Sequence, residues 1–549
     1  MTLGHLVRRF LFAVVLAAWA VGCASLPANV DRKPSQALGT PEQTALGQFV
    51  AQRRAQDRGR SDSGFVLLDT IELAYESRLA LIRNAQRTLD LQYYAIHADG
   101  STETLLEALR AAAQRGVRVR VLLDDFNTVG KDAQVLNLAF VPNVEMRLFN
   151  PLPGSRESLV TRLVGSLHDS ARIAKRMHNK MFIADNAIGI TGGRNLGDAY
   201  FGVDGKSNFV DLDVLAAGRV VRDMSASFDH FWNDDLAYPM QTLVSPADLE
   251  RLRKGPDGKD APDGPLKAAA AAEPPKQKGS VMPDVAPATP ARADPQSFDL
   301  RNLRFTWAPS ALLMDKPGKI DRDDDEVNAG DTVVDGLLAL MDGAKQDILI
   351  VSPYFVPGKA MVERFRKMKE RGVRVRVLTN SLASNDAPAA HVGYARYRKD
   401  LLAAGVELHE MRAALAGASG GTGGGSGIGS AGGGSKGNTS RASLHTKAVM
   451  IDGRLAVIGS MNLDLRSQTK NSEAGLVIRS AALAGAATQV IDAMIQRGSY
   501  RVVARADGGL LWQAPPGADY KDSFTEPEAT AKQRLLAGII APFAPDEML

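Results

Sequence analysis

Hydrophobic and polar positions follow the same order in two blocks of the chain, residues 85–122 and 344–378. Each block has an apolar β-rich run at either end and helical apolar spacing between the runs. The helical positions are Leu105, Leu106, Leu109 and Ala112 in the first block and Met361, Phe365 and Met368 in the second. A 3.6-residue period between two β-rich runs predicts a helix that connects two strands of one sheet. This order is typical of parallel strands with crossover helices.

The heptapeptide Gly-Val-Arg-Val-Arg-Val-Leu occurs unchanged at 116–122 and at 372–378. This internal duplication predicts an α/β protein with two similar lobes, residues 61–250 and 299–500. Each lobe is expected to hold a mixed, largely parallel sheet flanked by helices, and pseudo-twofold symmetry should relate the two. Alternating Arg and Val in the heptapeptide predicts a strand with one less buried face, near a sheet edge.

Four segments lie outside this pattern. Residues 24–60 are polar and rich in proline, which predicts a tether. Residues 251–298 combine Ala and Pro without an apolar period, so we expect a disordered linker. Residues 417–437 are almost all Gly and Ser and predict a flexible loop. Residues 501–549 carry scattered aromatic residues and are expected to form a C-terminal extension packed on a lobe.

The amino terminus has the pattern of a signal peptide over residues 1–23. Arg8 and Arg9 precede the apolar run 10–21, which is shorter than the roughly 20 residues that span a bilayer. The sequence that ends at Cys23 resembles a bacterial lipobox, which implies a lipid on that thiol. We therefore expect a lipid-anchored membrane protein that faces the periplasm, on the inner or the outer membrane. A secreted soluble protein with an incidental Cys23 is the alternative.

Composition narrows the class of protein. The 549 residues suggest two to four domains, and 45% hydrophobic content excludes wholesale disorder. A single cysteine excludes an internal disulfide and a cysteine-built zinc site. The formal charge of +4 is too small to indicate nucleic-acid binding by itself.

Each lobe carries the same spaced motif, His-x-Lys-x4-Asp followed by a glycine-led Gly-x-x-Asn. The motif residues are His178, Lys180, Asp185, Gly193 and Asn195 in the first lobe and His445, Lys447, Asp452, Ser460 and Asn462 in the second. Apolar residues separate Lys from Asp, so each motif should lie on a strand that enters a core. Side chains two apart on a strand share a face, so the His and Lys of each motif should point into one site.

This set of side chains suits phosphodiester chemistry without a metal ion or cofactor. Two lysines and two asparagines can stabilise the charge on phosphate oxygens. One imidazole can attack phosphorus while the other donates a proton to the leaving alkoxide. A carboxylate on the far ring nitrogen would fix each imidazole, and the candidates downstream are Asp211, with Asp213, and Glu473.

The doubled motif resembles the signature of the phospholipase D superfamily. Segments 90–94, 352–357, 380–385 and 393–398 look most like its bacterial cardiolipin synthase branch. The resemblance implies that His178 becomes a phosphatidyl-histidine and that His445 acts as general acid and then base. By position, the phosphate would be held by Lys180, Lys447, Asn195 and Asn462, with a one-sided hydroxyl contact from Ser460. Asp211 and Glu473 would orient the histidines, and Asp185 and Asp452 would complete the motif chiefly as structural supports.

The predicted function is a membrane-anchored phosphatidyltransferase that makes cardiolipin from phosphatidylglycerol and a second phospholipid, such as phosphatidylethanolamine. The alternatives are a phospholipase D that releases phosphatidic acid, a nuclease, and a catalytically inactive lipoprotein that binds surfaces. Phospholipids and a membrane are the expected partners, nucleic acid is not expected, and an accessory protein is left open. His97 and His391 are further candidates for the mouth of the site.

Overall fold

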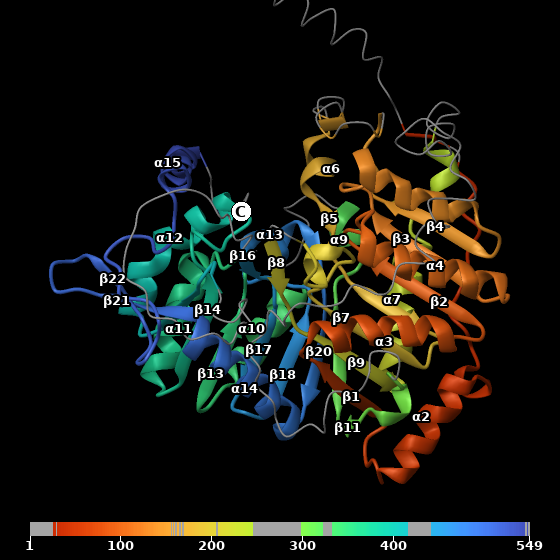
Figure 1. Ribbon diagram of the computed structural model, residues 1–549, viewed down its shortest axis with the longest axis horizontal. Coiled ribbons are helices and arrows are strands. Elements are labelled where there is room, and N and C mark those ends of the chain that lie inside the picture. Colours follow the sequence, from red (N-terminus) through yellow and green to blue (C-terminus); the bar gives the residue numbers. More distant parts are fainter. Residues whose placement is uncertain are drawn as a thin grey trace, which may run out of the picture.

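The computed structural model shows two α/β lobes side by side (Figure 1). It describes residues 26–28, 30–154, 156, 159, 162, 163, 166, 169–204, 207–244, 298–321, 332–414, 441–543 and 546. The predictions for residues 1–23 with Cys23, for the loop 417–437 and for nearly all of the linker 251–298 fall outside the described residues. The predicted pair of similar α/β lobes is confirmed.

The first lobe is built on a nine-stranded sheet of order β10-β4-β3-β2-β6-β7-β9-β1-β11. Its strands are β1 (Ser63–Leu68), β2 (Thr88–Tyr93), β3 (Arg118–Asp124), β4 (Val144–Phe149), β6 (Met181–Ala184), β7 (Ile188–Gly192), β9 (Asp213–Gly218), β10 (Ala237–Pro239) and β11 (Thr306–Trp307). The flanking helices are α3 (Ile71–Asn84), α4 (Gly100–Gln114), η2 (Gly130–Phe140), α6 (Ser170–Ala174), η3 (Asp198–Tyr200), α7 (Arg219–Trp232) and η4 (Met240–Thr242). Strand β11 follows the expected linker, so the later part of the chain returns to complete the first sheet.

The second lobe repeats this plan in a sheet of order β12-β20-β18-β17-β13-β14-β15-β21-β22. Its strands are β12 (Ser310–Met314), β13 (Asp347–Val351), β14 (Arg374–Asn380), β15 (Glu407–Met411), β17 (Ala448–Ile451), β18 (Leu455–Gly459), β20 (Ala474–Arg479), β21 (Ser499–Ala504) and β22 (Leu510–Gln513). Its helices are α9 (Gly318–Asp321), α10 (Val333–Asp342), α11 (Gly358–Glu370), α12 (Pro388–Ala403), α13 (Leu465–Thr469), α14 (Ala481–Gly498), α15 (Ala531–Ile540) and η9 (Ala541–Phe543). The short helix η7 (Leu300–Asn302) instead packs in the core of the first lobe through Leu300. The C-terminal residues therefore extend the second sheet through β21 and β22 and then place α15 on α12.

Both sheets are mixed, but they are less parallel than the sequence predicted. In the described chain, the parallel pairs of these sheets are β2–β3 and β3–β4 in the first and β13–β14 and β14–β15 in the second. These strands are the ones joined through helices. The neighbouring strands β6 and β7 are joined by a short turn at residues 185–187, and this tight connection makes the pair antiparallel.

Two short parallel ladders join the lobes, and each takes one strand from either side. Strand β5 (Arg176–Met177) pairs with β19 (Asn471–Ser472), and β8 (Ser207–Val210) pairs with β16 (Arg441–Leu444). One apolar cluster also spans the interface and includes Met224 of α7 and Ala487 of α14. The two lobes therefore share a core as well as backbone hydrogen bonds.

The expected tether, residues 24–60, packs on the first lobe over much of its length. It contains η1 (Pro41–Gln43) and α2 (Ala45–Gln56), and the Thr44 hydroxyl caps α2 by accepting from the Gly47 N–H at 3.0 Å. Leu46 and Val50 are buried in the core of that lobe. Helix α2 has no continuous apolar stripe, so the 3.6-residue period that predicts helices elsewhere is weak here.

The repeated heptapeptide forms inner strands, so the prediction of a strand near an edge is wrong. Arg120 of β3 is fully buried, and it pairs with Asp90 at 2.7 Å and Asp229 at 2.8 Å. In the second copy, Arg376 of β14 pairs with Asp492 of α14. The arginines therefore bind helices and strands of their own lobes through carboxylates, which compensates for the burial of their charge.

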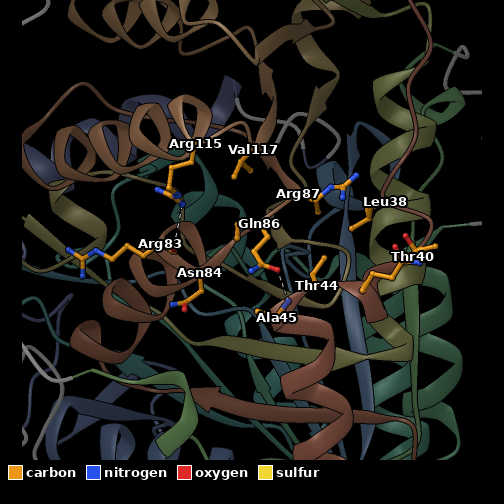
Figure 2. Close-up of a pocket in the computed structure, with 12 residues that line it drawn as sticks. Leu38, Thr40, Thr44, Ala45, Arg83, Asn84, Gln86, Arg87, Arg115 and Val117 are labelled. Carbon is orange, nitrogen blue, oxygen red and sulfur yellow. Dashed lines mark hydrogen bonds between the residues drawn. The ribbon is translucent and has the colours of Figure 1, made fainter.

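A cavity of about 650 Å³ lies where α2 meets the start of β2, and it is lined by Thr44, Arg83, Gln86, Arg115 and Val117 among others (Figure 2). The side-chain Oε1 of Gln86 in its wall accepts from the Ala45 N–H at 2.8 Å. The cavity is at the opposite end of β2 from the candidate catalytic histidines described below. In the described part of the chain, no helix is both long and apolar enough to cross a membrane.

Candidate active site

The two interlobe ladders position the candidate histidines. His178 follows β5 and Glu473 follows its partner β19, while His445 follows β16 and Asp211 follows β8. The His178 N–H donates to the Ser472 carbonyl at 2.9 Å, and the His445 N–H donates to the Val210 carbonyl at 2.8 Å. Each ladder therefore ends in one histidine and one carboxylate from opposite lobes.

The two carboxylates cross between the lobes. Nδ1 of His178 lies 3.0 Å from Oε2 of Glu473, and Nδ1 of His445 lies 2.7 Å from Oδ2 of Asp211. With a carboxylate at Nδ1, the neutral imidazole carries its hydrogen on Nδ1 and keeps the lone pair on Nε2. The neighbouring Asp213 instead forms ion pairs with Arg78 and Arg194, so it does not orient a histidine.

The lysines of the two motifs lie in matching surroundings. Lys180 Nζ donates to the His178 carbonyl at 2.7 Å, and Lys447 Nζ donates to the His445 carbonyl at 2.6 Å. Both side chains are buried, and each ammonium has an aromatic ring beside it: Tyr94 at 5.7 Å from Lys180 and Tyr354 at 5.8 Å from Lys447. Each lysine is thus fixed beside its histidine and retains further hydrogens for a bound anion.

The charges of the two motifs act on one another across the boundary between the lobes. Burial lowers the pKa of His178 to about 4 although Glu473 opposes this change. Burial, together with the charges of Lys447 and Lys180, lowers the pKa of His445 well below its ordinary value. Burial also lowers the pKa of Lys180 to about 7, with Lys447 adding to the effect, and that of Lys447 to about 8. An anion bound among these four groups would favour their protonated forms.

The two orienting carboxylates differ in their environments. Burial raises the pKa of Glu473, but His178, Lys180 and Ser460 outweigh it and hold that pKa below its usual range. The hydroxyl of Ser460 donates to Glu473 at 2.5 Å, and that of Ser467 donates at 2.9 Å. The Ser460 hydroxyl is therefore engaged by Glu473 in this structure, although the sequence placed it on the phosphate.

Asp211 has no such hydroxyl donor from the corresponding position of the first motif. Gly193 stands there, and a Cβ at this residue would lie 2.3 Å from an Asp211 carboxylate oxygen. Burial raises the pKa of Asp211, while Lys447 and Arg194 oppose the rise. Gly193 thus allows Asp211 to approach the backbone closely, whereas Ser460 forms a hydrogen bond with Glu473 at the equivalent position.

The two motif asparagines are buried at the site. Asn195 Nδ2 donates to the Tyr200 hydroxyl at 2.9 Å, and its Oδ1 accepts from the Ala95 N–H at 3.3 Å. The Asn462 backbone N–H donates to Ser467 Oγ at 3.2 Å, and its side-chain Oδ1 has no hydrogen-bond partner among the described residues. Asn462 therefore has the more available side chain for a ligand.

The motif aspartates lie outside the site, at the far ends of the motif strands. Asp185 accepts from the backbone N–H groups of Gln86, Arg87 and Thr88 at 2.8–2.9 Å. Asp452 accepts in the same way from the backbone of residues 345–347, at 2.7–3.1 Å. Both have positive φ, 51° and 52°. Each one therefore fixes the start of a neighbouring strand, β2 or β13, which is a structural role.

Aromatic rings that were not identified from the sequence surround the histidines. Tyr94 makes an edge contact with His178 at 5.1 Å between ring centroids. Tyr200 and Phe209 contact His445 at 5.3 Å and 4.9 Å. These rings limit the movement of the imidazoles and exclude water from them.

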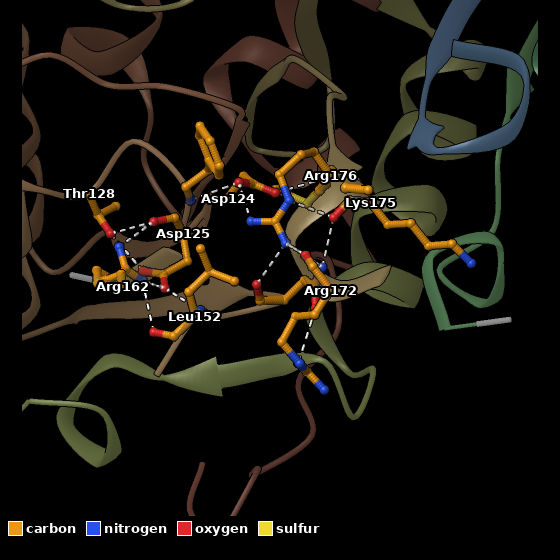
Figure 3. Close-up of polar contacts among 12 residues, drawn as sticks. Asp124, Asp125, Thr128, Leu152, Arg162, Arg172, Lys175 and Arg176 are labelled. Atoms are coloured by element: carbon orange, nitrogen blue, oxygen red, sulfur yellow. Dashed lines mark hydrogen bonds and ion pairs between the residues drawn. The ribbon is translucent and has the colours of Figure 1, made fainter. Parts of the chain in front are cut away.

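Two polar side chains hold the backbone directly before the histidines, and the sequence interpretation missed both. Asp124 accepts from the Met177 N–H at 2.9 Å and pairs with Arg176 at 3.3 Å (Figure 3). Asn380 accepts from the Leu444 N–H at 2.9 Å and donates to the Leu444 carbonyl at 2.9 Å. Both residues stand two positions after the repeated heptapeptide, so the duplication contained a signal for them.

The adjacent Asp125 organises the chain that leads to β5. Its carboxylate forms buried ion pairs with Arg156 and Arg162 and accepts from the Leu152 N–H at 2.9 Å (Figure 3). Because these contacts are buried, they bind Leu152, Arg156 and Arg162 firmly to the end of β3. Asp124 and Asp125 together therefore connect β3 to the segment that carries His178.

The two further histidine candidates have different positions. His97 pairs with Asp132 at 2.9 Å and stacks on Tyr200 at 6.3 Å between ring centroids, so one aromatic ring separates it from His445. His391 is buried in α12 beside Arg398 and Glu526 and does not line the mouth of the site. In the described residues, no group of three or more His, Cys, Asp or Glu side chains is arranged to hold a metal ion.

Comparison with known proteins gives consistent similarities. The family model described as "Cardiolipin synthase, PLD-like domain" matches twice, at residues 79–232 and 337–495. Cardiolipin synthase C of Escherichia coli is 37% identical over 432 residues, which are 78% of this chain and 83% of that protein. An uncharacterized protein of Helicobacter pylori is 29% identical over 94% of this chain and 95% of its own length. The crystal structure of phosphatidylserine synthase from Haemophilus influenzae aligns with a TM-score of 0.49 and 15% identity, over 82% of this chain and 91% of that one.

Proposed function

Since the chain belongs to the phospholipase D superfamily, among its cardiolipin synthase-like enzymes, we propose that it is a phosphatidyltransferase that makes cardiolipin from phosphatidylglycerol and a second phospholipid. The observation that carries this proposal is the pair of crossed histidine–carboxylate contacts, His178–Glu473 and His445–Asp211, with a lysine beside each histidine. This arrangement provides a nucleophile, a proton carrier and cationic charge around a single phosphorus atom.

In the first half-reaction, His178 Nε2 attacks the phosphorus of phosphatidylglycerol. A P–N bond forms and the P–O bond to the glycerol headgroup breaks. His445 donates its Nε2 proton to the departing alkoxide, so glycerol leaves as a neutral alcohol. Lys180 and Lys447 stabilise the charge on the phosphate oxygens. The crossed carboxylates keep both Nε2 atoms directed at the phosphorus, since each is held by its Nδ1–H.

In the second half-reaction, His445 accepts the proton of a hydroxyl on another phosphatidylglycerol. The hydroxyl oxygen attacks phosphorus, the P–N bond to His178 breaks, and cardiolipin is released. His445 is then protonated again for the next turnover. In the free site, burial favours the neutral form of His445, so the anionic phosphodiester supplies the negative charge that favours its protonation.

The products of purified enzyme with labelled phosphatidylglycerol test this proposal. Mass spectrometry should detect cardiolipin and glycerol in equal amounts, and His178→Ala should abolish both. Phosphatidic acid without cardiolipin would replace the synthase proposal with hydrolysis by water at the same site. Adding phosphatidylethanolamine to a parallel reaction identifies the second phospholipid through the release of ethanolamine.

Attachment to a membrane is the second part of the proposal, and a lipid on Cys23 would provide it. Support also comes from α15, which lies above α12 at the upper left of Figure 1. Its Leu535 and Ile539 are 66% and 56% exposed, and Lys532 and Arg534 lie on the same helix. Exposed aliphatic side chains next to cations suit the surface of an anionic bilayer.

Vesicle sedimentation tests this second part with the chain from residue 26 onward, which removes Cys23. Binding to phosphatidylglycerol vesicles should fall at least tenfold in Leu535→Asp/Ile539→Asp. The matched control is Asp507→Asn, which removes an exposed charge on the turn between β21 and β22 of the same lobe. Equal vesicle binding by all three proteins would contradict a role for α15.

A further inference from the structure

The two halves of the active site differ in the group that partners the tyrosine beside each lysine. On the His178 side, the hydroxyl of Tyr94 has the neutral amide of Asn127 next to it. On the His445 side, the hydroxyl of Tyr354 lies 3.0 Å and 2.9 Å from the two carboxylate oxygens of Asp386. Of these two tyrosine hydroxyls, that of Tyr354 thus has a carboxylate partner, whereas that of Tyr94 has an amide.

Asp386 is held in place by a well-ordered turn after β14. The turn begins at Asn380, the residue that binds the backbone before His445. Ser384 Oγ donates to Asn380 Oδ1 at 3.0 Å, and the Ala387 N–H donates to Asn385 Oδ1 at 2.8 Å. Hydrogen bonds thus order the turn on both sides of Asp386 and join its first residue, Asn380, to the backbone directly before His445.

The carboxylate of Asp386 faces the His445 half of the site. Its charge acts on Lys447 and on Tyr200, whose ring contacts His445. The residue itself is exposed, and Tyr354 occupies only part of the hydrogen-bonding capacity of its carboxylate. Free acceptor positions therefore remain next to the general acid.

The negative charge of Asp386 repels a phosphate, so this carboxylate is not suited to binding the phosphate itself. It is suited to a ligand group that donates hydrogen bonds. The alkoxide leaves in line with the attack by His178, and it departs toward His445. The rest of the headgroup is attached to that oxygen, so it must lie on the side of Asp386. Glycerol presents hydroxyl donors there, and ethanolamine presents an ammonium group, and both are groups that a carboxylate binds.

We propose that Asp386, oriented by Tyr354, is the recognition residue for a headgroup alcohol that carries hydrogen-bond donors, either hydroxyl or ammonium. This inference rests on the proposed function, because it assigns the headgroup side from the roles of His178 and His445. The same contact serves the departing headgroup in the first half-reaction and the glycerol hydroxyls of the acceptor in the second. Phosphate itself remains bound by the lysines.

The proposal can be tested by measuring headgroup release in the wild type, Asp386→Asn and Asp386→Ala. Each protein is given three phospholipid substrates, one at a time. The substrates are phosphatidylglycerol, phosphatidylethanolamine and phosphatidylmethanol, whose methyl headgroup has no donor. Loss of one charge-assisted hydrogen bond predicts a fall of roughly 10- to 100-fold in kcat/KM for glycerol or ethanolamine release, relative to methanol release by the same variant. A larger fall for ethanolamine than for glycerol with Asp386→Asn identifies the ammonium as the main ligand, and a larger fall for glycerol identifies the hydroxyls.

Tyr354→Phe provides a second variant that leaves the carboxylate in place but removes the hydroxyl that orients it. Its kcat/KM for glycerol or ethanolamine release, relative to methanol release, should also fall, but by less than in the Asp386 variants. A proportional loss for all three substrates, or unchanged ratios in both Asp386 variants, would overturn the proposal. Failure of the wild-type protein to cleave any of the three lipids would count against the proposed function itself, so the two failures are distinguishable.

Discussion

Glu473 contacts His178 across 295 positions of sequence and across the boundary between the lobes, at 3.0 Å from Nδ1. The reciprocal contact joins Asp211 to His445 across 234 positions. Because each imidazole is oriented by the opposite lobe, a shift of one lobe against the other changes the direction of both Nε2 atoms. Catalytic geometry and the interlobe ladders are therefore coupled.

Replacing Glu473 by Gln should lower kcat by roughly 10³- to 10⁴-fold, with little change in KM. An amide can present its NH2 to Nδ1, which stabilises the tautomer with the hydrogen on Nε2 and blocks the attacking lone pair. Steady-state kinetics with phosphatidylglycerol measure the change. Ser460→Ala, which removes one donor to Glu473 but leaves the carboxylate, serves as the control and should lose only about tenfold.

The pH dependence of kcat/KM should be bell-shaped. His178 attacks only when neutral, so activity rises as the pH increases through its pKa of about 4. His445 must carry a proton to act as general acid, so activity falls as the pH increases through its lowered pKa. Activity falls further as Lys180 and Lys447 lose the protons with which they stabilise phosphate, at pKa values of about 7 and about 8. Initial rates on mixed micelles between pH 3.5 and 9 measure the profile.

The variant Lys180→Arg distinguishes the contribution of Lys180 to this pH profile from the contributions of other groups. A guanidinium stays protonated throughout this range, so the part of the alkaline decline near pH 7 should move toward the pKa of Lys447. An alkaline limb that does not move would show that a group other than Lys180 controls it.

Asn380→Ala should lower both stability and kcat. It leaves the N–H and the carbonyl of Leu444 without their present partner, and unsatisfied buried groups cost about 1–3 kcal/mol each. Chemical denaturation should show the loss, and activity per folded molecule should also fall because Leu444 directly precedes His445. Asn137→Ala, an amide substitution remote from the ladders, is the comparison; equal activity per folded molecule in the two variants would exclude a positioning role.

Asp452→Asn should destabilise the second lobe by about 1–3 kcal/mol with near-normal activity per folded molecule. The carboxylate accepts from three consecutive backbone N–H groups, and asparagine keeps one acceptor and tolerates the left-handed φ of 52°. Thermal unfolding measures the first effect and lipid turnover the second. A large loss of kcat in the folded variant would instead indicate a direct role in the reaction.

Much of this architecture could be predicted from local patterns. The repeated heptapeptide and the doubled motif indicated two α/β lobes because both repeat at a fixed spacing. The identity of Asp211 and Glu473 as partners for the histidines followed from their matching positions. The crossing of these partners did not, since spacing along the chain contains no information about which lobe a side chain faces.

Other features depended on distant partners. Arg120 alternates with valine, which is a solvent-face pattern, but Asp229 of α7 neutralises it in the interior. Asp386 lies among ordinary turn residues, and only its contact with Tyr354 places it at the site. Helix α2 has weak periodicity and obtains its order from the core that Leu46 and Val50 enter.

The exchange of carboxylates has a consequence for each half of this protein. A single half would possess a histidine and a lysine but would lack the acid that directs its imidazole, so it would be chemically incomplete as a monomer. A protein made of one such repeat would need two associated copies, each supplying the acid for the histidine of the other. Because one polypeptide contains both halves, each half can carry a different residue at an equivalent position, as Gly193 and Ser460 show.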